Sequence, residues 1–123
     1  MAQIYLDKLS NMMAEIASEI SQLKDLEIKH FFSGAAAYVD GRIFLSLTPA
    51  GFALKLPDGL RKELTRDKGA KYLRYFPKSP IKKNYVVLPM KILDDKDMLY
   101  FWVEKSIEYV LTLPKPNNKS TKS

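Results

Sequence analysis

Lysine and arginine side chains are concentrated in one internal segment, where they alternate with aromatic residues. Between positions 61 and 83 nine basic residues face only two acidic ones, so this segment carries +7, whereas the whole chain carries +6. Ammonium and guanidinium groups neutralise phosphates, and exposed tyrosine rings stack on unpaired bases. The segment is therefore a candidate nucleic-acid surface, and its candidate contact residues are Arg61, Lys62, Arg66, Lys68, Lys71, Arg74, Lys82 and Lys83.

Other interpretations of this segment stay open. Charged side chains must cover the solvent face of any small domain, and part of the aromatic set Tyr72, Tyr75 and Phe76 is expected in the core. The same positive charge would attract an acidic protein partner. A homodimer formed through a sheet edge or an apolar patch is a further alternative.

Catalytic and metal chemistry finds little support in the residue types. The chain has no cysteine, which excludes a thiolate nucleophile, a zinc–cysteine site and a disulfide framework. His30 is the single histidine, and we expect it to be structural or at the solvent edge, because metal ligation usually needs three or four partners. Asp94, Asp95 and Asp97 precede an amphipathic segment, which fits helix capping better than a divalent-cation site. We expect no enzyme activity, no catalytic residue, no cofactor and no metal.

The elements that must position these residues follow from hydrophobic periodicity and turn signals. Apolar residues recur at three- and four-residue spacing from Leu9 to Leu23, which predicts a helix over residues 3–23. Asp40-Gly41 is a type I′ hairpin signal, because both positions must tolerate positive φ. Asp94 or Asp95 is expected to cap a final helix. The other predicted elements are strands at 28–32, 35–39, 42–47 and 52–56, a helix at 60–70, and strands at 71–76 and 84–89.

A run of small residues, Gly34 to Ala37, lies within the first predicted hairpin. Side chains this small let a helix approach a strand closely, or let the strand bend or bulge. A backbone nest for an anion at Ser33-Gly34 is the alternative, but no phosphate-loop spacing surrounds it. We expect the run to serve packing against the first helix.

The order of elements predicts an α+β fold, a two-layer sandwich with an antiparallel sheet of five to six strands and helices on one face. Connections between the strands are too short for parallel crossovers. Residues 1–113 are expected to form one domain, and residues 114–123 a disordered basic tail without apolar side chains beyond its prolines. Acidic residues interrupt the N-terminal region, and no apolar stretch approaches the roughly 20 residues that span a bilayer. We expect a soluble, cytoplasmic protein without membrane contact.

Several short motifs follow one another along the chain. They are Phe32-Ser33-Gly34, Tyr38-Val39-Asp40-Gly41, Phe44, Leu54-Lys55, Tyr75-Phe76, Tyr85 through Pro89, and Trp102. With this order and spacing the chain resembles the N-terminal domain family of TfoX, the bacterial competence regulator, over roughly residues 5–112. The resemblance implies an α+β fold, no catalytic activity or cofactor, and a regulatory or interaction role of the transcription or competence type.

Overall fold

The computed structural model describes residues 2–17, 25–31, 33–74, 78 and 80–114, which form the predicted helices and strands in order and one further short helix, α3, that was not predicted. In chain order the elements are α1 (Ala2–Ala17), β1 (Glu27–Phe31), β2 (Gly34–Val39), β3 (Arg42–Thr48), β4 (Gly51–Lys55), α2 (Asp58–Asp67), β5 (Lys71–Leu73), β6 (Lys82–Val87), α3 (Met90–Leu93) and α4 (Lys96–Leu111).

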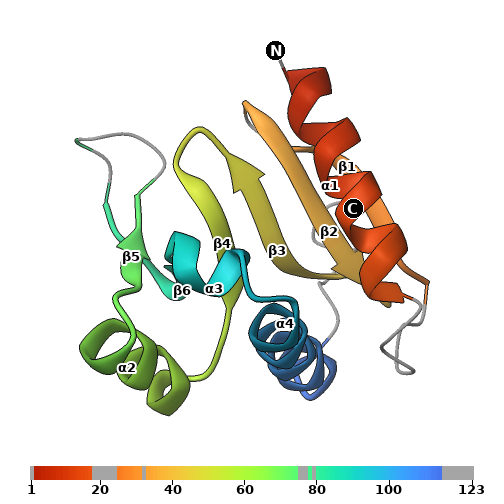
Figure 1. Ribbon diagram of the computed structural model, residues 1–123. Coiled ribbons are helices and arrows are strands. Elements are labelled where there is room, and N and C mark those ends of the chain that lie inside the picture. Colours follow the sequence, from red (N-terminus) through yellow and green to blue (C-terminus); the bar gives the residue numbers. More distant parts are fainter. Residues whose placement is uncertain (1, 18–24, 32, 75–77, 79, 115–123) are drawn as a thin grey trace.

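The strands form one sheet in the order β1-β2-β3-β4-β6-β5, and every neighbouring pair is antiparallel. Figure 1 shows α1, α3 and α4 against one face of this sheet, with α2 beside the β5–β6 end. The predicted α+β fold, with an antiparallel sheet and helices layered on it, is confirmed.

Some predicted boundaries need correction. The second helix begins at Asp58, directly after the extended Pro57, and ends at Asp67 rather than at residue 70. Gly69, with φ of +84°, breaks the helix there. Of the strand predicted over 71–76, β5 covers Lys71–Leu73, its pairing with β6 shifts register between Tyr72 and Leu73, and residues 75 and 76 lie outside the described residues. The predicted end of the first helix and the basic tail from residue 115 onward lie outside the described residues.

The small residues of β2 serve two kinds of close approach. A Cβ atom added at Gly34 would lie 2.2 Å from the carbonyl oxygen of Leu47 and 2.8 Å from the Cα of Thr48. Only glycine therefore lets β2 lie so near β3 at this point. Ala35 and Ala37 are fully buried in the hydrophobic core, on the strand against which α1 packs. The predicted packing role of this run is confirmed.

The hairpin that joins β2 to β3 has the predicted turn. Asp40 and Gly41 both have positive φ, +50° and +79°, as a type I′ turn requires. Arg42 then donates from Nη1 to Asp40 Oδ2 at 2.8 Å and from Nε to the carbonyl oxygen of Leu113 at 2.8 Å. Because Leu113 directly follows α4, this one guanidinium fastens the C-terminal end of that helix to the hairpin.

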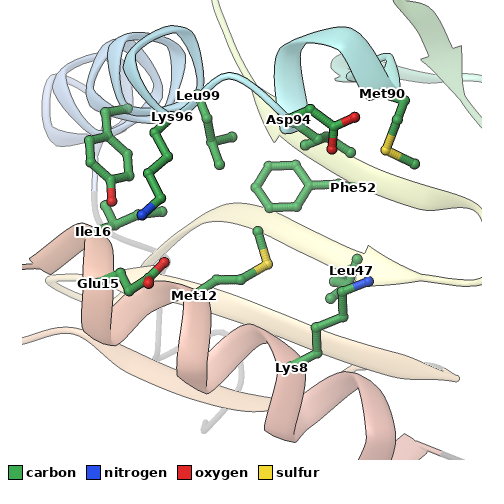
Figure 2. A pocket seen from close by; sticks show the side chains of 12 residues that line it. Lys8, Met12, Glu15, Ile16, Leu47, Phe52, Met90, Asp94, Lys96 and Leu99 are labelled. Atoms are coloured by element: carbon green, nitrogen blue, oxygen red, sulfur yellow. The ribbon is translucent and has the colours of Figure 1, made fainter.

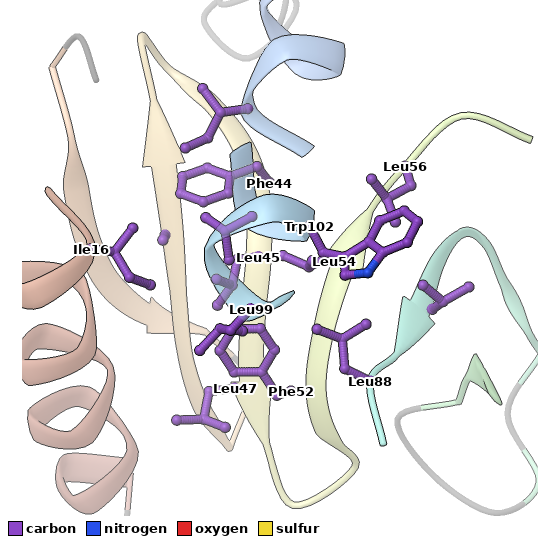
Figure 3. Packing of buried hydrophobic residues seen from close by; sticks show 14 of the residues in the cluster. Ile16, Phe44, Leu45, Leu47, Phe52, Leu54, Leu56, Leu88, Leu99 and Trp102 are labelled. Atoms are coloured by element: carbon purple, nitrogen blue, oxygen red, sulfur yellow. The ribbon is translucent and has the colours of Figure 1, made fainter. Parts of the chain in front are cut away.

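The core lies between the sheet and the helices. Figure 3 shows Trp102 of α4 near Leu54 and Leu56, and Leu99 near Phe52, and all these residues belong to one buried cluster. Ser106 is fully buried beside them, and its Oγ lies 2.9 Å from the carbonyl oxygen of Phe44 and 2.7 Å from that of Lys55. This hydroxyl fixes α4 to β3 and β4 together.

Candidate functional site: a basic end and an apolar groove

The basic segment occupies α2, β5 and β6, at the end of the sheet where β5 is the edge strand (Figure 1). Lys62 and Arg66 lie on α2 with 63% and 73% of their side chains exposed. Lys71, Arg74, Lys78 and Lys82 are also exposed, on or beside β5 and β6. We call this region the basic end and define it by Lys62, Arg66, Lys71, Arg74, Lys78 and Lys82.

The remaining candidate residues differ from this set. Lys68 is half-buried at the C-terminal cap of α2. Lys83 lies in β6, and its side chain is outside the described part of the chain. Lys62 forms an ion pair with Asp58 at 3.2 Å, but both side chains are mostly exposed, so the pair holds Lys62 only weakly.

Arg61 points inward rather than toward a partner. Its side chain is only 12% exposed, its Nη1 donates to the carbonyl oxygen of Leu56, and its Nη2 donates to Asp58 Oδ1 at 3.2 Å. Its Nε is buried and has no hydrogen-bond acceptor among the described residues. Arg61 therefore fastens the first turn of α2 to Leu56, the residue after β4, and of the candidate residues whose side chains are described it offers least to a partner.

A shallow depression lies within the basic end. Asp58, Arg61, Tyr72 and Ile81 line an open hollow of about 340 Å³ between α2 and the β5–β6 hairpin. Tyr72 and Ile81 are 41% and 40% exposed. An aromatic ring is thus available to a partner among the basic groups. The other two aromatic residues of the segment, Tyr75 and Phe76, lie outside the described residues.

The other polar candidates either lie exposed on the surface or cap a helix. His30 is exposed on β1. Asp95 caps α4, because its side chain accepts from the backbone N–H of Met98 at 3.2 Å, and Asp97 lies in the first turn of that helix. The predicted capping role is therefore confirmed. Within the described ranges, no three potential metal ligands among His, Asp and Glu come together.

A second concave feature was not anticipated from the sequence. Figure 2 shows a groove between α1 on one side and α3 and α4 on the other, with β3 and β4 beneath it. Its volume is about 320 Å³. We call it the α1–α4 groove, and its lining residues are Lys8, Met12, Glu15, Ile16, Leu47, Phe52, Met90, Leu93, Asp94, Lys96, Leu99 and Tyr100.

The α1–α4 groove combines an apolar floor with a charged rim. Leu47 and Phe52 of the sheet are buried at its base, as are Ile16 and Leu99 of the flanking helices. Met90, 66% exposed, stands at the opening. The rim carries charges of both signs on both sides.

Part of this groove has a signal in the sequence. Lys8, Met12 and Glu15 are spaced by four and three residues, which places them on one face of a helix. The opposite wall, however, lies some eighty positions further along the chain. Only the fold brings the two walls together.

None of the helices in the described ranges is long and apolar enough to cross a membrane.

The described residues form an α+β module whose surface offers a basic end and an apolar groove. The family model for the TfoX N-terminal domain matches residues 18–110, and the chain belongs to this family. Comparison with curated proteins gives no match. Comparison with solved structures gives none either.

Proposed function

We propose that the chain is a non-enzymatic regulatory module of the TfoX N-terminal domain family that works in the cytoplasm and contacts single-stranded nucleic acid through its basic end. One observation carries this proposal: the segment with a charge of +7 folds into α2, β5 and β6, which lie together at one end of the sheet. A regulatory role of the transcription or competence type is supported by family membership alone.

The residues before and after the basic end strengthen this argument. Residues 1–60 and residues 84–114 each carry a net charge of −2, and the other positive segment is the tail, residues 115–123, with +3. The positive field is therefore concentrated rather than spread over the molecule. Such a concentration attracts a polyanion to one place and orients it there.

Tyr72 favours a single strand over a duplex. Its ring is 41% exposed beside an open hollow. An unpaired base can stack on such a ring, whereas the bases of a duplex are already stacked on each other. Salt-dependent attraction to the phosphates and stacking on Tyr72 would then act together.

Lysines on an edge strand also have a purely structural use, because they discourage edge-to-edge association of sheets. The experiment must separate that use from nucleic-acid binding. We would measure fluorescence anisotropy with labelled single-stranded and duplex oligonucleotides at about 50 and 200 mM salt, the range in which phosphate-driven affinity falls by orders of magnitude. The test variant is Arg66→Glu/Lys71→Glu. The control variant is Lys8→Glu/Lys96→Glu, which makes the same change in net charge at the α1–α4 groove.

The proposal predicts micromolar binding of the single strand, weaker binding of the duplex, and a steep loss of affinity with salt. The test variant should lose at least about tenfold in affinity, and the control should stay close to the unmodified chain. No binding at the lower salt concentration overturns the proposal. Equal losses in both variants show that net charge alone matters, which overturns the assignment to the basic end.

A further inference from the structure

We propose that the α1–α4 groove binds an uncharged small molecule that has an apolar body and one hydrogen-bonding polar end. The groove shares no lining residue with the basic end and is built from different elements. The inference is therefore independent of nucleic-acid binding.

The size of the groove selects a small molecule. A volume of about 320 Å³ lies at the lower end of the range for small-molecule sites, about 300–1,000 Å³. The groove is also far larger than the water-sized voids that ordinary packing leaves.

The floor of the groove selects an apolar body. Leu47, Phe52 and Leu99 present carbon surfaces at the base, and Met12 and Met90 stand nearer the opening. Met90 is 66% exposed, so a large apolar side chain lies in water at the entrance of the groove. Methionine adapts its shape to a bound partner more easily than branched side chains do.

The rim of the groove selects an uncharged ligand. In Figure 2 Glu15 and Lys96 stand toward one end of the opening, and Lys8 and Asp94 toward the other. A ligand with a single charge would meet a like charge at either end, which cancels most of its attraction. An uncharged hydroxyl or amide avoids this repulsion, and the rim supplies both donors and acceptors for it, including the hydroxyl of Tyr100.

The C-terminal segment of the chain does not fit this groove. Residues 115–123, KPNNKSTKS, bring one proline and otherwise polar or basic side chains, which do not match an apolar floor. A second copy of the chain is an alternative occupant, and the experiment below separates it from a small ligand.

The test uses three probes with the same eight-carbon chain: 1-octanol, octanoate and octylammonium. Each is titrated into the ¹⁵N-labelled full chain, and the amide shifts of Leu47, Phe52 and Leu99 are followed by NMR. We expect 1-octanol to bind at least about fivefold more tightly than either ion, because an ion loses hydration on entering the apolar groove while the rim, with two charges of each sign, returns little net attraction.

Matched variants locate the site. Met90→Glu places a charge at the mouth of the groove and should weaken 1-octanol binding about tenfold. Ile4→Glu makes the same change at a site that is equally exposed, 64% against 66%, but does not line the groove. It should leave the affinity unchanged. Both positions are mostly exposed, so both variants should fold.

Several results would overturn the proposal. They are the absence of any shift at the groove amides, equal or tighter binding of an ion, and equal losses in the two variants. Sedimentation of the unmodified chain and of Met90→Glu provides the last arm. A dimer that Met90→Glu dissociates would make the groove an interface between two copies instead of a small-molecule site. Since no arm uses an oligonucleotide, a negative result here leaves the proposed function standing, and the reverse also holds.

Discussion

At Gly34 the sheet leaves no space for a side chain. A methyl group there would meet backbone atoms of β3 at 2.2 and 2.8 Å, and backbone cannot move aside as a flexible side chain can. We expect Gly34→Ala to lower the free energy of unfolding by about 2–4 kcal/mol, because β2 and β3 must separate. Urea unfolding followed by circular dichroism measures this change.

Gly59 provides the matched control. It lies in α2, and a Cβ atom added there meets nothing within 4 Å. Gly59→Ala should raise the free energy of unfolding by up to about 1 kcal/mol through helix propensity alone. The interpretation of Gly34 is wrong if the two substitutions shift the urea midpoint in the same direction.

Arg61 and Arg66 share one helix but have different surroundings. Arg61 is 12% exposed and donates to Leu56 and Asp58, whereas Arg66 is 73% exposed. We expect Arg61→Lys to cost about 1–2 kcal/mol of stability, because one ammonium cannot replace the planar fork of donors. Arg66→Lys should change stability by less than about 0.5 kcal/mol. Thermal unfolding of both variants tests this, and equal losses would contradict it.

Asp40-Gly41 and Arg61 show which features of single residues could be predicted from the sequence and which could not. Asp40-Gly41 was predictable because a type I′ turn is decided by the two residues themselves. The inward direction of Arg61 was not, because it depends on where β4 ends and where α2 begins. Composition and spacing give all eight basic candidates the same appearance. Only tertiary contacts separate Arg61 from its neighbours.

At the scale of elements, α4 is held to the sheet by one buried hydroxyl as well as by apolar packing. Ser106 serves the carbonyl oxygens of Phe44 and Lys55, on two different strands. Ser106→Ala should lower the free energy of unfolding by about 1–2 kcal/mol, because the two carbonyl oxygens lose the one hydroxyl hydrogen that they share. Ser10, exposed on α1, is the control, and Ser10→Ala should be neutral or slightly stabilising. Denaturant unfolding of both variants decides, and equal effects would refute the anchoring role.

The elements with strong local periodicity were predicted, and the elements without it were not. The apolar stripe of α1 recurs over enough residues to identify a helix, and the turn signal Asp40-Gly41 marks the start of β3, where Ile43, Leu45 and Leu47 stand at alternate positions. By contrast, α3 has four residues and no period to read. The α1–α4 groove was missed for a related reason, since α3 forms part of its wall and α1 lies at the other end of the sequence.

At the scale of the whole molecule, the fold builds two surfaces from different parts of the chain. The basic end uses α2, β5 and β6, and the α1–α4 groove uses α1, α3, α4 and two central strands. Lys8 and Lys96 line the groove and Lys71 lies at the basic end, although all three are exposed lysines. This separation makes each surface a control for the other.

The salt dependence of binding is where this separation is measured most directly. For a single strand, the slope of log affinity against log salt changes by about 0.7 for each phosphate contact. If Lys71 contacts a phosphate, Lys71→Ala flattens the slope by about that amount, whereas Lys96→Ala leaves it unchanged. Anisotropy titrations at four or more salt concentrations give both slopes. Equal flattening by the two variants would mean that the oligonucleotide senses only the diffuse field of the protein and has no fixed place at the basic end.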